Sequence, residues 1–178
     1  MDNEQTVQSA QSPVRLAQHF ADSNKFRELF SYGMDLVEET ATFLDTDGRQ
    51  AAKTLSKPAQ SVYGAESMRL TTRLMQLASW LLLQRAVAEG EMTVEQAISE
   101  KKNVKLNQLQ PRKGGPGWDD LPEDFLSLVD RSVALQRRIK RLDDEIYNAD
   151  KVEVEAPKNH VASQRALLET AFDRRFGS

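Results

Sequence analysis

A heptad pattern near the C-terminal end restricts most strongly what this chain can fold into. Eight positions follow one another at alternating steps of four and three residues, and all but one are apolar: Leu121, Phe125, Leu128, Ser132, Leu135, Ile139, Leu142 and Ile146. Residues at this spacing share one face of an α-helix, and a regular leucine repeat is typical of a seam between packed helices. The pattern predicts a long helix that starts near Pro122 and packs against other helices.

Two earlier segments also have helical periodicity. Ser23 fits an N-cap, and apolar residues then recur at helical spacing: Phe26, Leu29, Phe30, Met34, Val37, Ala41 and Leu44. The turn-forming run from Asp45 to Gly48 should end this first helix. Pro58 fits the first turn of a second long helix, which we expect to run to about Glu89 and to stop at Gly90.

The connection between the second and third long helices is long. Thr93 and Gln96 have the spacing of a capping box, which predicts a short helix over residues 94–102. Residues 103–120 are predicted to be a loop, because the run PRKGGPGW concentrates glycine and proline.

We therefore predict an all-α fold, a three-helix up-and-down bundle with a short extra helix. The bundle domain should span residues 22–149. Residues 1–21 are polar and predicted to be a disordered N-terminal tail, and residues 150–178 a flexible C-terminal tail.

Composition argues against several classes of protein. The chain has no cysteine and a net charge of −3, and its first residues lack the apolar core of a secretory signal. The longest stretch without charged or amide residues, Leu77 to Leu83, is too short to span a membrane. We expect a cytoplasmic protein.

Catalytic and metal-binding chemistry is not predicted either. The only histidines, His19 and His160, fall in the predicted tails, and no set of nucleophile, base and orienting group can be assembled. We expect no metal or cofactor, and a protein that is not an enzyme.

The second long helix has three distinct faces when its residues are placed at 100° intervals. Leu70, Leu74, Leu77 and Leu81 form one apolar stripe, and Met68, Met75, Leu82 and Ala86 form a second. Two separate apolar stripes predict a middle helix that is packed by two different neighbours.

The third face is polar and carries Arg69, Arg73, Gln76, Trp80 and Gln84, which we call the Arg/Trp face. One interpretation is a strip of ion pairs with Glu66 or with Glu38 and Glu39 of the first helix. The other is a surface for protein binding or self-association, because Trp and Arg are enriched at interface hot spots.

The C-terminal tail contains a short amphipathic segment. Its predicted binding residues are Leu168, Phe172, Arg174, Arg175 and Phe176. One hypothesis is a helix that folds when it binds a partner. The other is that the segment folds back onto the bundle.

Two further questions stay open at this point. The heptads can be the core of one chain or a seam between two chains of a dimer. In addition, a local basic cluster, Lys101, Lys102, Lys105, Arg112 and Lys113, makes a DNA-associated regulatory protein an alternative. A small structural or scaffold dimer is a third possibility.

A family resemblance rests on two quoted stretches. ESMRLTTRLMQLASWLLLQRAVAEGEM, residues 66–92, resembles the signature of the alphaproteobacterial regulator-of-CtrA-degradation (RcdA) family, and FSYGMDLVEETATFLDTDGR, residues 30–49, supports it. The resemblance implies a dimeric three-helix bundle that acts as a non-enzymatic adaptor. It implies that a ClpXP-type protease, primed by the response regulator CpdR, receives cell-cycle substrates such as CtrA with the adaptor's help.

Overall fold

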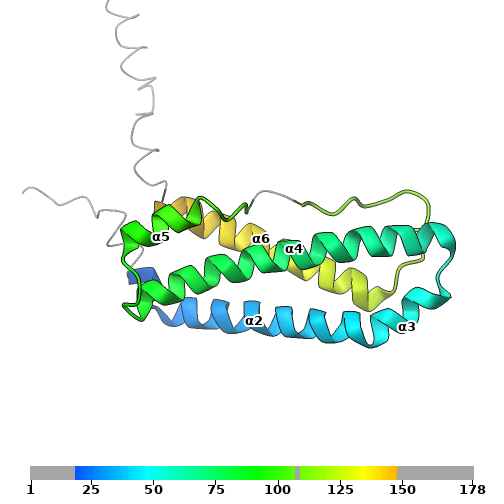
Figure 1. Ribbon diagram of the computed structural model, residues 1–178, viewed down its shortest axis with the longest axis horizontal. Coiled ribbons are helices and arrows are strands. Elements are labelled where there is room, and N and C mark those ends of the chain that lie inside the picture. The colour runs from blue at the N-terminus through cyan, green and yellow to red at the C-terminus, as the bar shows by residue number, and fades with distance from the viewer. Residues whose placement is uncertain (1–18, 107–108, 148–178) are drawn as a thin grey trace, which may run out of the picture.

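Three long helices form the bundle, and two short helices connect them. The computed structural model describes residues 19–106 and 109–147. The long helices are α2 (Asn24–Asp45), α4 (Lys57–Ala88) and α6 (Glu123–Tyr147), and the short ones are α3 (Asp47–Thr54) and α5 (Val94–Lys101). Within these ranges the chain forms no strand, and the elongated helical body is seen in Figure 1. The predicted all-α bundle is confirmed.

The helix ends follow the local chemistry of the sequence. Ser23 caps α2, because its Oγ accepts a hydrogen bond from the Phe26 N–H at 3.1 Å. Pro58 lies in the first turn of α4, and Gly90 follows the end of that helix with a φ of 71°. Thr93 caps α5 through the predicted capping box with Gln96. These signals are local, so the sequence alone predicted the bounds of α2, α4 and α5 well, whereas α3 begins inside the run from Asp45 to Gly48 that was predicted to be a turn.

The chain path differs from the expected up-and-down order in one respect. Tyr63 packs against Phe125, Arg73 binds Ser132, and Trp80 binds Asp143. The residue numbers of these partners increase together along the two helices, so α4 and α6 run parallel. Of the long helices, only α2 is antiparallel to them.

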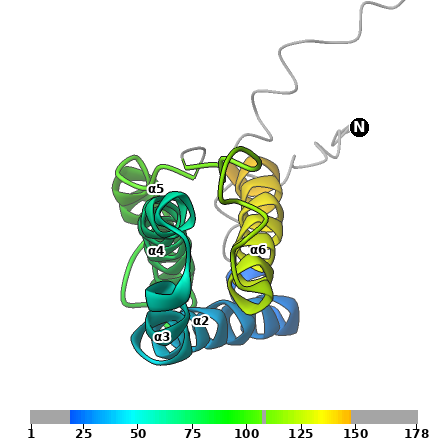
Figure 2. The same ribbon diagram turned by 90° about the vertical axis from the view of Figure 1, so that its right-hand side faces the viewer.

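The connection between α5 and α6 makes this parallel order possible. We call its described parts, residues 102–106 and 109–122, the strap. It returns along the bundle over α4 and α6, on the side opposite α2 (Figures 1 and 2). About 20 residues at roughly 3.3 Å each can span a helix of 25 residues, which is about 38 Å long.

The heptad face of α6 forms the core of a single chain. Seven of its eight positions are buried, and Leu142 is half-buried. Phe125 packs against Phe43 and Tyr63 from two other elements. The intrachain interpretation of the heptads therefore holds. The core also begins earlier than residue 22, since Ala21 is 2% exposed and the Phe20 ring packs against Trp80.

The second apolar stripe of α4 is not packed by a neighbour within the described structure. Its members Met68, Met75 and Leu82 are 74%, 65% and 49% exposed, and Ala86 is half-buried. The first stripe, from Leu70 to Leu81, is fully buried. The prediction that both stripes are covered is thus wrong for the second, because the Arg/Trp face takes its place inside the bundle.

Candidate functional site

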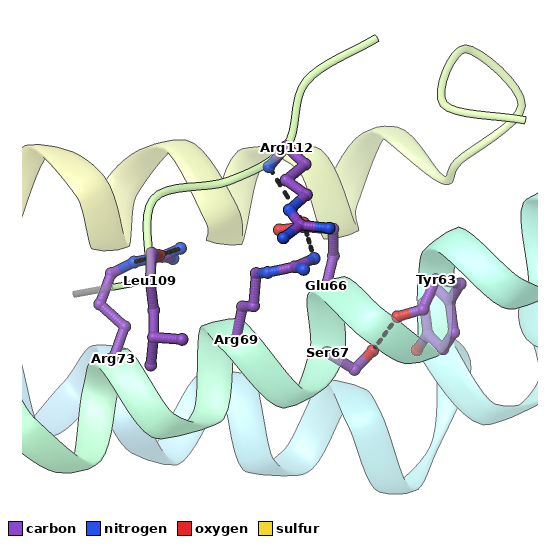
Figure 3. A network of polar contacts seen from close by, with 7 residues as sticks. All are labelled: Tyr63, Glu66, Ser67, Arg69, Arg73, Leu109 and Arg112. Atoms are coloured by element: carbon purple, nitrogen blue, oxygen red, sulfur yellow. Dashed lines mark hydrogen bonds and ion pairs between the residues drawn. The ribbon is translucent and has the colours of Figure 1, made fainter. Parts of the chain in front are cut away.

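Arg73 lies at the centre of a buried polar network under the strap. Its side chain has no exposed surface. Nε and Nη2 donate to the Leu109 carbonyl at 3.2 and 2.6 Å (Figure 3). Nη1 donates to Ser132 Oγ at 2.6 Å. Burial lowers the pKa of Arg73, whereas the nearby Glu66 carboxylate acts in the opposite direction. The guanidinium thereby links α4, the strap and α6.

Glu66, about two helical turns before Arg73 on α4, also holds the strap. It is 1% exposed, and its Oε1 accepts hydrogen bonds from Arg69 Nη1 at 2.7 Å and from the Arg112 backbone N–H at 3.1 Å (Figure 3). Oε2 has no partner among the described residues. The ion pair between Arg69 and Glu66 confirms one of the two pairings considered for this face.

Trp80 and Gln84 bind α6 instead of facing outward. Trp80 is fully buried, and its Nε1 donates to Asp143 Oδ1 at 2.8 Å. Lys101 of α5 lies 2.8 Å from the same carboxylate. Gln84 Nε2 donates to the Tyr147 hydroxyl at 2.8 Å. Burial raises the pKa of Tyr147, and its hydrogen bond to Gln84 lowers it in part.

These positions correct the expectation of an exposed Arg/Trp face. Arg73, Trp80 and Gln84 are at most 1% exposed and already have hydrogen-bond partners. Arg69 keeps only 20% of its side chain exposed, and Gln76 is half-buried. Arg73, Trp80 and Gln84 join α4 to α6 and the strap, so little of the predicted face is left for a partner in this fold.

The outward face of α4 is uncharged along most of its length. Every exposed residue from position 60 to position 82 lacks a charge: Gln60, Ser61, Gly64, Ala65, Met68, Thr71, Thr72, Met75, Ser79 and Leu82. We call this set the α4 ridge. It extends over about 33 Å at 1.5 Å per residue. In a chain with 29% charged residues, such a face is a candidate contact surface.

The sequence contains a signal for the α4 ridge that apolar periodicity does not reveal. Met68, Met75 and Leu82 recur every seven residues, and the residues between them on this face are small or neutral. Apolar spacing alone could not show which of three faces is buried. The absence of charge at ten outward positions marks this face as unusual.

The other predicted binding residues lie in the C-terminal tail. Leu168, Phe172, Arg174, Arg175 and Phe176 fall outside the described residues. All five residues of the predicted basic cluster lie within the described ranges, and two of them are paired, Lys101 with Asp143 and Lys113 with Asp130. No group of three metal-ligating side chains occurs in residues 19–106 and 109–147, and no described helix could cross a membrane.

Comparisons with known proteins add to this geometry. A family model described as "Protein of unknown function (DUF1465)" matches residues 17–172. The crystal structure of RcdA from Caulobacter crescentus CB15 is similar, with 46% sequence identity and a TM-score of 0.60. The match covers 73% of this chain and 97% of that chain. None of the curated proteins compared with the chain matches it.

Proposed function

The chain belongs to the family described as "Protein of unknown function (DUF1465)", together with RcdA from Caulobacter crescentus, and we propose that it is a non-enzymatic adaptor in regulated proteolysis. The relationship implies a regulator of CtrA degradation. The proposal adds a mechanism in which protein–protein contacts bring cell-cycle regulators to a ClpXP-type protease in the cytoplasm.

The α4 ridge is the observation that carries the proposal. It is long and uncharged, and Met68 and Met75 are its most exposed large apolar side chains. Large exposed apolar patches on soluble domains usually mark interaction sites. Methionine side chains adapt their shape to different partners, as an adaptor with several cargo proteins requires.

Tethering would supply the effect on proteolysis. An adaptor that holds both protease and cargo raises the local concentration of cargo to the millimolar range when the linker is short. We propose the α4 ridge as one contact and the tail residues Leu168, Phe172, Arg174, Arg175 and Phe176 as another. The partners would be ClpXP, the response regulator CpdR and cargo such as CtrA.

We also propose that the chain forms a homodimer. Both seams considered for it from the sequence, the heptads of α6 and the Arg/Trp face of α4, are occupied inside one chain. The α4 ridge is the long uncharged helix face that is left for a second copy. Small residues such as Gly64, Ala65 and Ser79 would let two helices approach closely there.

A reconstituted degradation assay tests the adaptor function. Purified ClpXP, CpdR and CtrA are mixed with the wild-type chain or with Met75→Lys. We expect the wild type to accelerate CtrA loss and Met75→Lys to reduce the acceleration about tenfold, because a charge on the α4 ridge must be desolvated on binding. Ser31→Lys, on the exposed face of α2, is the matched control and should keep full activity.

Truncation after Asp150 tests the contribution of the tail. If the tail contacts a partner, the truncated chain keeps the melting temperature of the full chain and loses cargo delivery. A large drop in melting temperature would instead mean that the tail is part of the folded bundle. If the full-length wild type does not accelerate CtrA loss, the adaptor proposal itself is contradicted.

A further inference from the structure

A second surface lies between the strap and α6, and unlike the uncharged α4 ridge it is rich in charged side chains. It is an open groove of about 1080 Å³. Arg112 and Lys113 of the strap form one wall, and Arg131 and Arg137 of α6 form the other. Pro111 and Val133 contribute apolar lining.

The groove is basic although the chain as a whole is acidic. Four cationic side chains line it, against one acidic residue, Asp130. Lys113 pairs with Asp130 at 2.8 Å, and Arg131 pairs with Glu39 of α2. The guanidinium groups of Arg112 and Arg137 have no acidic partner in the part of the chain that the structure describes.

The buried network fixes the strap wall of this groove. Glu66 binds the backbone N–H of Arg112, and Arg73 binds the carbonyl of Leu109 (Figure 3). Gln110 donates to Gln136 of α6 at 2.9 Å. The wall is therefore held in place before any ligand arrives, which reduces the entropy lost on binding. Glu66 and Arg73 act as positioning residues for the groove.

We propose that this groove binds an acidic segment of a partner protein. Arg112 and Arg137 would each bind a carboxylate, and Arg guanidinium groups form strong bidentate bonds with carboxylates. Apolar side chains between the carboxylates would contact Pro111 and Val133. The inference goes beyond the adaptor proposal, because it assigns a ligand class to a different surface and does not depend on proteolysis.

A protein segment fits this groove better than nucleic acid does. Affinity for duplex DNA grows with the number of phosphates that are neutralised. Among the cationic side chains described in this groove, only those of Arg112 and Arg137 lack an acidic partner, so few phosphates could be neutralised. An extended peptide can alternate acidic and apolar side chains, as the lining requires.

Fluorescence anisotropy with a defined probe tests the proposal. The probe is a fluorescein-labelled peptide, Asp-Glu-Leu-Asp-Glu-Leu-Asp-Glu, added to the full chain at 50 mM NaCl. The reference peptide has Asn and Gln in place of Asp and Glu. We expect the acidic peptide to bind at least about tenfold more tightly than the reference, and the difference to shrink at 300 mM NaCl.

Charge-reversal variants locate the binding. Arg137→Glu and Arg112→Glu should each weaken binding of the acidic peptide by about tenfold or more. Arg49→Glu, an exposed site on α3, makes the same charge change elsewhere and should stay within about twofold. Circular dichroism and melting temperature verify that all three variants are folded.

Three outcomes would overturn the inference. The first is no binding of the acidic peptide at 50 mM NaCl. The second is equal weakening by Arg49→Glu, which would mean attraction by overall charge. The third is that a 20-base-pair DNA duplex binds more tightly than the peptide and that this binding is lost in Arg137→Glu. Each readout is direct binding, so failure of the degradation assay leaves this test intact.

Discussion

At the scale of single residues, Arg73 illustrates why a charged side chain can be a core residue. The interior disfavours its charge, but three of its N–H groups find oxygen acceptors, two of them on the carbonyl of Leu109. The carboxylate of Glu66 supplies a negative charge close to the guanidinium. An Arg in a buried site is tolerated when its donors are paired in this way.

Removing Arg73 should be costly. Arg73→Ala leaves the Leu109 carbonyl and the Ser132 hydroxyl without this donor and removes one of the two cations near Glu66. We expect the free energy of unfolding to fall by about 3 kcal/mol or more, measured by urea denaturation. Arg85→Ala, which breaks a half-exposed ion pair with Glu89, should cost about 1 kcal/mol or less. Equal losses for the two variants would show that Arg73 is not buried.

Tyr147 makes stability depend on alkaline pH. Burial raises its pKa above the ordinary value of 10.0, so the unfolded chain loses this proton first as the pH rises. The contribution of Tyr147 to stability is therefore full below pH 10 and declines as the pH rises through the pKa of the folded state. Burial acts on Tyr63 in the same direction.

The test compares denaturation at pH 9 with denaturation above pH 10. Tyr147→Phe should make the alkaline loss of stability less steep than in the wild type, because the ionising group is gone. Tyr32→Phe, at an exposed position on α2, is the control and should keep the wild-type steepness. A Tyr147→Phe profile that matches the wild type would rule out this origin of the pH dependence.

At the scale of elements, α6 and α4 differ in what their sequences specify. The heptads of α6 have one apolar face, so periodicity predicted both the helix and the buried residues. On α4, two apolar stripes and the Arg/Trp face compete for the interior, and periodicity alone could not rank them. The choice depends on distant groups, the Leu109 carbonyl and the Asp143 carboxylate, whose positions follow from the whole fold.

A comparison of two adjacent residues, Leu74 and Met75, tests which face of α4 is buried. Leu74 is 3% exposed, and Met75 is 65% exposed. Leu74→Ala should lower the free energy of unfolding by about 2–5 kcal/mol, since it leaves a cavity in the core. Met75→Ala should change it by about 0.5 kcal/mol or less. Urea denaturation of both variants measures these free energies. A larger loss of stability for Met75→Ala than for Leu74→Ala would mean that Met75, and not Leu74, faces the core.

At the scale of the whole molecule, the strap is the feature that the sequence did not reveal. Its glycines and prolines predicted a loop, and an up-and-down bundle was then the simplest path. The parallel order of α4 and α6 depends on bonds made by Glu66, Arg73 and Gln136 to strap residues. Bonds between residues 30 to 46 positions apart leave no periodic pattern in the sequence.

The same path gives the molecule two surfaces of different chemistry. The strap and the Arg/Trp face fill one side of α4, which leaves the α4 ridge on the outside. The strap and α6 form the basic groove. Three of the contact residues predicted on α4, Arg73, Trp80 and Gln84, are therefore buried, and the α4 ridge is the exposed face that we propose instead. The predicted tail residues stay a proposal.

Methionine oxidation tests the central claim, that the α4 ridge is exposed in the single chain and is covered on assembly with a second copy or with the partner proteins. Dilute chain, alone or with ClpXP, CpdR and CtrA, is treated with hydrogen peroxide, and sulfoxide at each methionine is quantified by mass spectrometry. We expect Met68 and Met75 to oxidise faster than half-buried Met92 in the free chain, and to be protected several-fold in the assembly. Unchanged oxidation of Met68 and Met75 on assembly would contradict the account.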